Sequence, residues 1–566
     1  MAATLTETGG YLAGTRTPLY VFGHCPARVR GAVVIVAPFA EEKKAAQRAL
    51  VEAARDLTEA GWDVLRCDLS GTGDSGGEHA TADLATWLAD VRTALACQRS
   101  RYPGLPLCVI GLRLGAALAW LAADGEHPVD QLVLWEPVVN GESYMRQNRQ
   151  RSQIRAQLTA GEGPGSGTPS DVAHPAFDFD GFAVSARLHA DLAGIDLLAA
   201  PPAAAGQTLV LQISGSSRLK KPLEELAAHA TAATLAAVTV EAFWSAIGLV
   251  DTAPVRATTR DWLIVGEAER EPALLPLSPS ADLADDLRAE ALSFASGDQR
   301  CHGVLYRMPG AGGGRAALLL HGWSGYRIGP GQLLTASARA LARAGCPAYS
   351  FDFRGRGESE WAVGEASLNS MIRDAARAVP VVAERTGATA ITLLGLCSGG
   401  EVALGASLSD PRVDTLALWS APVFSGAFTL ARQARRSRAA LSGYWRKLFV
   451  GETWAKLLGG RLNWRLIARA LSGGRSAEDA GVQDKAPDTA TQMRAFEAFS
   501  GRLLFIYGGN DPETEPSRAF YREFVERTGM AHHFVEVAGS NHNYYSAAWH
   551  AEVIGATLSW LRGETR

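Results

Sequence analysis

The sequence has few cysteines, and none is arranged for a disulfide framework or a metal site. There are seven in 566 residues, none in a CxxC pair. Most stand in apolar runs, as is typical of buried, reduced thiols in a cytosolic protein. Cys397 is the exception, because it lies in a glycine-framed turn. The glycine-rich stretch at 310–314 precedes an expected strand instead of following one, so it is no dinucleotide-binding fingerprint. We therefore expect neither a metal nor another cofactor.

Long apolar runs and blocks of like charge are also missing. No run reaches the roughly 18 apolar residues of a membrane span, and the start MAATLTETGGYLAG lacks the basic and apolar regions of a secretory leader. The formal charge of -4 comes from 55 basic and 59 acidic residues, without a terminal block of one sign. These features predict a cytoplasmic protein with no integral membrane span and no nucleic-acid partner. They leave the oligomeric state open.

What the sequence does contain is an internal duplication. A chain of 566 residues with 47% hydrophobic residues can bury more than one core. In each half, short β-branched runs alternate with amphipathic stretches, which is the pattern of βα units around a mostly parallel sheet. The strings LWEPV at 134–138 and LWSAPV at 418–423 match closely enough to fix the register between the halves.

We expect an α/β fold with two tandem domains, each a mostly parallel, doubly wound sheet with a helical cap insertion. The first domain spans 1–268, with its cap at about 142–206. The second spans 287–566, with its cap at about 424–500. Residues 269–286 are rich in proline, serine and charge and have no apolar period, so they are expected to form the linker.

The second half contains a candidate nucleophile. Gly395-Leu396-Cys397-Ser398-Gly399 lies between an apolar strand and a small-residue helix, the setting of a nucleophile elbow. Glycines flank such a turn because its strained backbone leaves no room for side chains. The turn would expose the Cys397 thiol at a helix N-terminus, which favours the thiolate. Ser398 is the alternative nucleophile, but the glycine frame is centred on Cys397.

Two further residues follow expected strands in the chain order nucleophile, acid, base. Asp511 ends RLLFIYGGND, and His542 follows HHFVEVAGSN. His542 would take the proton from Cys397, and Asp511 would fix the imidazole tautomer and stabilise the imidazolium. A lone loop histidine is usually surface decoration. Three residues at three strand ends in this order favour a Cys-His-Asp triad.

The loop after the first central strand of the second half predicts an oxyanion hole. His321-Gly322-Trp323-Ser324 follows the apolar run ALLL. The backbone N–H groups of Trp323 and Ser398 would hold a developing alkoxide, and each such donor lowers the barrier by about 3 kcal/mol. His321 is expected to support the turn. The stretch FDFRGRGES at 351–359 is expected to be a structural glycine-rich turn.

The first half lacks all three of these side chains. Arg113 occupies the elbow position in Gly111-Leu112-Arg113-Leu114-Gly115, and no carboxylate follows the strand TLVLQIS. Phe243 and Trp244 stand where the histidine would be. The first half is therefore expected to be a degenerate hydrolase-like domain that packs against the second.

Arg113 itself has two interpretations. At a helix N-terminus it is a candidate substrate-binding residue for a carboxylate or a phosphate. The simpler alternative, which we favour, is an ion pair within the domain to Glu41 or Glu42.

The expected second cap is basic and amphipathic. Residues 432–469 hold many arginines and lysines and the single acid Glu452. Interleaved aromatic and aliphatic residues, among them Trp445 and Trp454 as candidate substrate contacts, could cover the thiol and shape an acyl pocket. The arginines are explained equally well as a solvated face. Otherwise they suit an acyl carrier protein, coenzyme A or an anionic membrane surface.

Together these motifs resemble the α/β-hydrolase superfamily. APFAEEKKAAQR, GLRLGAAL and LWEPVVNGESYMRQ in the first half are similar to the exosortase-A-system-associated hydrolase type 2. LLLHGWSGYRIGP, GLCSGG and YWRKLFVGE in the second half are similar to the type 1 partner. The resemblance covers nearly the whole chain and implies a natural fusion of two α/β-hydrolase subunits. It supplies no established substrate.

The leading functional hypothesis is a thioesterase or esterase that forms an acyl-Cys397 intermediate from a small-molecule acyl substrate. An acyltransferase is the first alternative, because an acyl thioester stays activated toward amines and alcohols and a carrier-protein or CoA thioester could supply the acyl group. The second alternative is a noncatalytic binding or scaffold protein. That reading would need both halves to lose their triads, whereas the second half keeps all three residues.

Overall fold

The structure is a computed structural model that describes residues 6–159, 177–246, 250–310, 312–362, 364, 366–423 and 496–564. Almost all of the expected second cap, including Trp445 and Trp454, lies outside these residues. Among the described residues no helix is long and apolar enough to cross a membrane.

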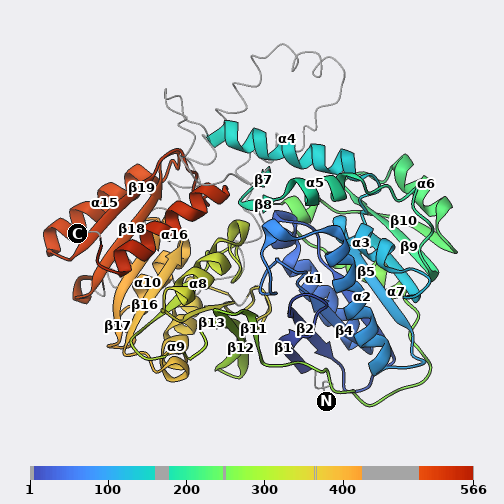
Figure 1. Cartoon of the computed structure of the whole chain (residues 1–566), viewed down its shortest axis with the longest axis horizontal. Helices are drawn as coiled ribbons and strands as arrows, with labels where there is room; N and C mark the ends of the chain where they lie inside the picture. The colour runs from blue at the N-terminus through green and yellow to red at the C-terminus, as the bar shows by residue number, and fades with distance from the viewer. Residues whose placement is uncertain are drawn as a thin grey trace, which may run out of the picture.

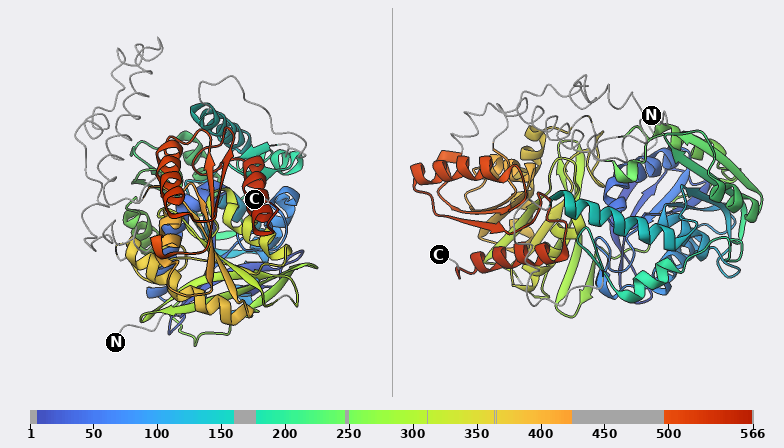
Figure 2. Two further views of the ribbon diagram at one scale, coloured as in Figure 1. Left: turned by 90° about the vertical axis from the view of Figure 1, so that its left-hand side faces the viewer. Right: turned by 90° about the horizontal axis from the view of Figure 1, so that it is seen from above.

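Two sheets lie side by side, each with helices on both faces (Figures 1 and 2). The eight strands of the first sheet have counterparts in the same order in the second, which adds one edge strand, β11. In sheet order, the first half contributes β1 (Thr6–Leu12), β2 (Leu19–Cys25), β4 (Trp62–Cys67), β3 (Gly31–Val36), β5 (Leu107–Leu112), β6 (Val129–Trp135), β9 (Ala205–Ser214) and β10 (Ala233–Thr239). The second half contributes β11 (Ser280–Ala284), β12 (Leu287–Ser296), β13 (Gln299–Arg307), β15 (Ala348–Phe351), β14 (Arg315–Leu320), β16 (Ala390–Leu396), β17 (Val413–Trp419), β18 (Arg502–Gly508) and β19 (His532–Val537).

In both sheets the early strands pair antiparallel and the later strands pair parallel. The expected duplication and the two mostly parallel sheets are therefore confirmed. The central strands are buried along their whole length, as expected of strands covered by helices on both faces.

The helices of the first half are α1 (Glu41–Glu59), α2 (Leu84–Arg101), α3 (Leu114–Ala122), α4 (Gly141–Thr159), α5 (Ala186–Ala193), α6 (Lys221–His229) and α7 (Ala253–Trp262). Those of the second half are α8 (Leu333–Arg343), α9 (Leu368–Thr386), α10 (Ser398–Ala406), α15 (Thr514–Thr528) and α16 (Ala547–Leu561). Short 3-10 turns are η1 (His79–Thr81), η2 (Phe243–Ser245) and η3 (Pro330–Gln332). The described part of the first cap holds α4, α5 and the hairpin of β7 (Phe177–Phe179) and β8 (Phe182–Val184).

The stretch expected as a linker, 269–286, is held against the first half along much of its length. Arg270 N donates to Val29 O at 2.8 Å, and Ser278 N donates to Tyr11 O at 2.9 Å. Leucines at 275 and 277 pack on the first core, and the stretch ends in β11. The composition of 269–286 predicted a free loop. In the structure, backbone hydrogen bonds and two leucine side chains attach this stretch to the first half.

The cores of the two halves meet. Tyr11, Tyr20 and Phe22 of β1 and β2 share one hydrophobic cluster with residues of β12, β13 and α8. The ring of Phe22 packs edge-on against that of His302 with centroids 5.0 Å apart. The two domains are therefore joined by a continuous apolar interior as well as by the chain.

Equivalent helices also donate hydrogen bonds across this junction. Arg55 of α1 and Arg339 of α8 stand at the same position in the two halves, counted from the glycine that follows each helix. Arg55 NH2 donates to Ser359 O at 3.3 Å, and Arg339 NH2 donates to Ser75 O at 2.7 Å. Ser75 and Ser359 close equivalent glycine-rich turns, so each half fastens the same turn of the other.

Buried ion pairs reinforce these turns. Arg327 pairs with Asp352 in its own half and with Asp74 of the first half, the latter at 2.8 Å. Arg66 of the first half pairs with Glu358, which is the counterpart of Asp74. The side chains of Arg327, Asp74 and Asp352 are at most 2% exposed. The stretch 351–359, expected to be structural, supplies Asp352 and Glu358 to this junction.

Candidate active site

Cys397 lies at the strand-to-helix turn between β16 and α10. Its φ of 57° and ψ of -127° are a strained combination for a residue with a side chain. A Cβ on Gly395 would approach Gly399 O to 2.2 Å, and one on Gly399 would approach Leu320 O to 2.2 Å. Only glycine fits at these two positions. The sequence frame thus forms the sharp turn that it predicted.

His542 and Asp511 meet at the same edge of the sheet. Asp511 follows β18, His542 follows β19, and His542 Nδ1 donates to Asp511 Oδ2 at 2.7 Å. A second side-chain hydrogen bond joins His542 to Cys397. Since Nδ1 is engaged by the carboxylate, Nε2 is the nitrogen that faces the sulfur. The three residues expected as a triad are therefore in contact.

The electrostatics favour a charged imidazole. Burial alone would lower the pKa of His542, but the nearby Cys397 sulfur and the hydrogen bonds with Asp511 and Cys397 raise it well above 6.5. An imidazolium between a carboxylate and a thiol stabilises the thiolate, which is the nucleophilic form.

The loop expected to form the oxyanion hole lies against the elbow. A Cβ on Gly322 would be 3.3 Å from the Cys397 Cβ, so the loop backbone approaches the thiol closely. Trp323 N donates to Ser398 Oγ at 2.7 Å. The N–H of Trp323, one of the two expected oxyanion donors, is therefore directed at the elbow, where it binds the Ser398 hydroxyl.

His321 supports this loop, as the sequence indicated. Its Nδ1 donates to Gly322 O at 2.8 Å, and its Nε2 accepts from Phe353 N at 3.3 Å. Burial lowers the pKa of His321 to about 3, so the ring stays neutral and can both donate and accept.

The first half keeps the elbow backbone without the nucleophile. Arg113 has φ 55° and ψ -118°, nearly the angles of Cys397. Its Nε lies 3.7 Å from Glu42 Oε1, so the ion pair that we favoured from the sequence is formed. The guanidinium also packs over the rings of Tyr144 and Trp244 at 5.5 and 5.2 Å. Glu42 therefore neutralises the positive charge of Arg113, which would otherwise be available to an anionic ligand.

The positions of the first half that are equivalent to His542 and Asp511 also hold other residues, and these too make contacts. Trp244, expected at the histidine position, is the ring stacked on Arg113. Near the end of β9, Lys220 pairs with Glu136. The alignment of the two halves had placed Trp244 at the position of the histidine. Tyr144 and Lys220 were missed because they come from segments that the duplication does not align.

The first cap also reaches the loop that bears His542. Asp178 Oδ2 accepts from Ser546 Oγ and from Ala547 N, both at 2.8 Å, at the first turn of α16. Lys44 Nζ donates to Tyr545 OH at 3.2 Å. Sequence reasoning missed these contacts, since no local pattern marks a residue that caps a helix of another domain.

A doubly wound sheet with this strand order and a strained residue at the turn into a central helix defines an α/β-hydrolase domain. This chain contains two such domains in tandem. Residues 27–163 match the model of the family described as "Serine aminopeptidase, S33", and residues 317–556 match the "Alpha/beta hydrolase family".

Individual relatives are distant. A monkeypox virus protein named "Monoglyceride lipase homolog" is 28% identical over 123 residues, which are 21% of this chain and 45% of that protein. The match thus spans less than half of the length of that curated relative.

Solved structures that are similar to about half of the chain include a dienelactone hydrolase and an esterase. A dienelactone hydrolase from Anabaena variabilis is 16% identical and covers 50% of this chain and 100% of its own, with a TM-score of 0.33. An esterase from Pyrococcus furiosus is 14% identical and covers 49% and 92%, with a TM-score of 0.34. At such identities the likeness concerns the fold alone.

Proposed function

We propose that this protein is an ester or thioester hydrolase that forms an acyl intermediate on Cys397. The observation that carries the proposal is the position of His542, hydrogen-bonded to both Cys397 and Asp511. The first domain is proposed to be a noncatalytic partner that holds the second. We also propose that the halves derive from the exosortase-A-system-associated types 2 and 1.

The geometry suggests a two-stage reaction. The Cys397 thiolate attacks the acyl carbonyl carbon, an S–C bond forms, and the N–H groups of Trp323 and Ser398 donate hydrogen bonds to the oxyanion. The oxyanion then re-forms the carbonyl, the C–O or C–S bond to the leaving group breaks, and His542 gives the departing alcohol or thiol its proton. Water then attacks the acyl thioester, His542 takes its proton, and the acid leaves with Cys397 restored.

Ser398 fits a supporting role better than that of nucleophile. Its hydroxyl accepts the Trp323 N–H, whereas His542 is bonded to Cys397. For an incoming carbonyl oxygen to reach the Trp323 N–H, the Ser398 side chain must rotate away.

The substrate class follows from the nucleophile. Thiolates exchange readily with thioesters, so acyl groups on an acyl carrier protein or coenzyme A are the favoured substrates, and simple esters such as those suggested by the lipase relative come second. The basic segment 432–469 would suit an acidic carrier, although it lies outside the described residues.

The test combines turnover with trapping. Hydrolysis of acyl-CoA thioesters and aryl esters would be measured for the full chain, for Cys397→Ala, and for Cys346→Ala as a matched control at another half-buried thiol. We expect loss on the order of 10⁴-fold or more in Cys397→Ala and unchanged turnover in the control. Intact mass spectrometry should show one acyl adduct that Cys397→Ala abolishes.

The second stage separates the alternatives. Release of the adduct by water supports hydrolysis, and release only by an added amine or alcohol would identify an acyltransferase. An adduct that survives in Cys397→Ala and disappears in Ser398→Ala would overturn the proposed nucleophile. No adduct and no turnover with any acyl donor would favour a scaffold.

A further inference from the structure

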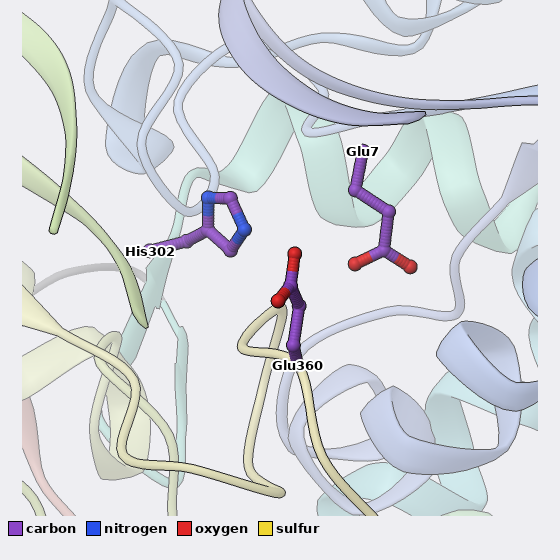
Figure 3. A group of neighbouring side chains, drawn as sticks. All are labelled: Glu7, His302 and Glu360. Atoms are coloured by element: carbon purple, nitrogen blue, oxygen red, sulfur yellow. The ribbon is translucent and has the colours of Figure 1, made fainter. Parts of the chain in front are cut away.

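Three potential metal ligands from both halves of the chain meet at the junction. Glu7 comes from β1, His302 from β13, and Glu360 from the end of the second glycine-rich turn. One ligand atom from each lies within 4.8 Å of the other two. Figure 3 shows the outer ring nitrogen of His302 directed toward the two carboxylates, which converge from opposite sides.

Backbone contacts hold these side chains in place. His302 N donates to Ser359 Oγ at 2.9 Å, and Arg300 N donates to Glu360 Oε2 at 2.8 Å. Glu360 N in turn donates to Arg300 O at 3.2 Å. Glu360 is therefore fastened to the strand that carries His302, so the histidine and this carboxylate form one rigid unit.

The burial of His302 is a second, independent indication of a bound ligand. His302 is only 6% exposed, and its buried Nε2 has no hydrogen-bond partner among the described residues. A buried polar atom left unpaired is costly, by roughly 1–3 kcal/mol. A neutral imidazole has one ring nitrogen with a free lone pair, which is the donor that a metal ion needs.

Glu7 accepts hydrogen bonds from neighbouring side chains, as carboxylates that bind metals commonly do. Arg55 Nε donates to Oε1 at 2.7 Å, and Arg55 NH2 donates to Oε2 at 2.9 Å. Oε1 also pairs with His24 Nδ1 at 3.0 Å. Arg55 pairs with the carboxylate of Glu7, and Glu360 brings a second carboxylate to the site.

We propose that Glu7, His302 and Glu360 bind a divalent transition-metal ion, Zn²⁺ by preference, that bridges the two domains. One imidazole nitrogen with two carboxylate oxygens is a donor set that suits Zn²⁺. Ligand atoms around tetrahedral zinc are about 3.4 Å apart, so from separations within 4.8 Å the site closes by at most about 1.4 Å on binding. Arg55 and His24 then orient Glu7 from behind, as outer partners do in metal sites.

The site is a structural device, separate from Cys397. Because its ligands come from both halves, the ion binds only the docked arrangement and stabilises it by mass action. Zn²⁺ should therefore raise the unfolding temperature of the full chain.

The experiment uses the full-length chain with Cys397→Ala, since the Cys397–His542 pair could itself hold zinc. After chelation, Zn²⁺ binding is measured by calorimetry, and Co²⁺ is added as a spectroscopic probe of tetrahedral coordination. We expect one ion per chain and a visible Co²⁺ absorption band. Glu360→Gln is the decisive variant, because Glu360 is half-buried and the change keeps its shape and the hydrogen bond from Arg300.

Glu360→Gln should weaken Zn²⁺ binding by at least 10–100-fold and abolish the rise in unfolding temperature. His127→Gln, which removes a histidine that pairs with Asp124 and is not one of the three ligands, should change neither. Binding of equal strength in Glu360→Gln, or no metal-dependent stabilisation of the parent chain, would overturn the proposal. Because the nucleophile is absent throughout, neither outcome bears on the proposed hydrolysis.

Discussion

At the scale of single residues, Cys397 differs from the other six thiols in what surrounds it. Burial raises the pKa of Cys25, Cys67 and Cys346 to about 12. The thiols at 97, 108 and 301 are shifted in the same direction. Cys397 instead lies at a helix N-terminus beside His542, whose own pKa is raised. Both effects favour its thiolate.

The first prediction is therefore selective alkylation. At about pH 7, iodoacetamide should label Cys397 while Cys25 and Cys346 stay largely thiol and react at least 10-fold more slowly. Peptide mass spectrometry over time measures this. Asp511→Asn should slow the labelling of Cys397, because His542 loses the carboxylate that favours its charged form. Equal labelling rates for all partly exposed thiols would contradict the activation of Cys397 by His542.

The pH dependence has a defined sign. His542 has a raised pKa in the folded protein, so its protonation contributes stability fully below 6.5, and that contribution is lost as the pH rises through the higher folded value. Cys397 should react faster than a free thiol only while His542 is protonated. This difference in labelling rate should therefore disappear as the pH rises through the raised pKa of His542.

A second prediction concerns Ser398. Ser398→Ala removes the acceptor of the Trp323 N–H but leaves the backbone donors in place. We expect turnover within about 10-fold of the parent, since a lost oxyanion donor costs 10²–10³-fold and none is lost here. Steady-state kinetics with a thioester substrate measures it. A loss comparable to that of Cys397→Ala would make the hydroxyl the nucleophile.

At the scale of elements, both elbow turns were predictable from the sequence, whereas the contacts that surround the elbow of the first half were not. Its glycines and its place between a strand and a helix are local features, so the sequence indicated the turn at Cys397 and its counterpart at Arg113. The stacking of Arg113 between Tyr144 and Trp244 depends on contacts between distant segments. The same holds for Asp178, which caps α16 from another domain.

The third prediction tests that cap. Asp178→Asn keeps the shape but removes the negative charge at the first turn of α16, which should lower the free energy of unfolding by about 0.5–2 kcal/mol. Since α16 follows the loop that bears His542, turnover should also fall. Urea unfolding and kinetics are compared with Asp196→Asn, an exposed turn residue whose carboxylate accepts only local backbone bonds. A variant no different from this control would show that the cap has no influence.

At the scale of the whole molecule, repeated motifs predicted both sheets, because strand periodicity and matched strings are carried by the chain itself. The way the halves dock was not predictable. Arg55 and Arg339 look like ordinary helix-surface arginines in the sequence, and residues 269–286 look like a free loop. Their hydrogen bonds form only when the two halves are packed together.

The fourth prediction concerns the buried ion pairs at the junction. Arg327→Met leaves Asp74 and Asp352 buried without their cation, which should cost about 3–5 kcal/mol. Arg518→Met, which breaks a more exposed pair with Glu536, should cost less than about 1 kcal/mol. Chemical unfolding measures both. Adding Asp74→Asn to Arg327→Met should recover part of the loss, and simple additivity would argue against coupling across the junction.

The fifth prediction is sensitivity to mild acid. Burial lowers the pKa of His550 to about 4 and that of His321 to about 3, whereas both return to about 6.5 on unfolding. The unfolded chain thus binds more protons between these values, so stability is lost as the pH falls from 6.5 toward 4. At pH 5 each histidine should cost on the order of 2 kcal/mol. His550→Gln should flatten the pH dependence of urea unfolding, and an unchanged slope would contradict this.

The exchange of Arg55 and Arg339 between equivalent turns implies an ancestry. Contacts made by the same residue in both directions are those of a homodimer about a two-fold axis, in which one gene product supplies both sides. After duplication and joining, selection for the interface would persist in both copies while selection for the nucleophile was relaxed in one. If the first domain is the noncatalytic partner proposed above, its elbow residue was free to change, as at Arg113, while the surface that docks on the second domain stayed under selection.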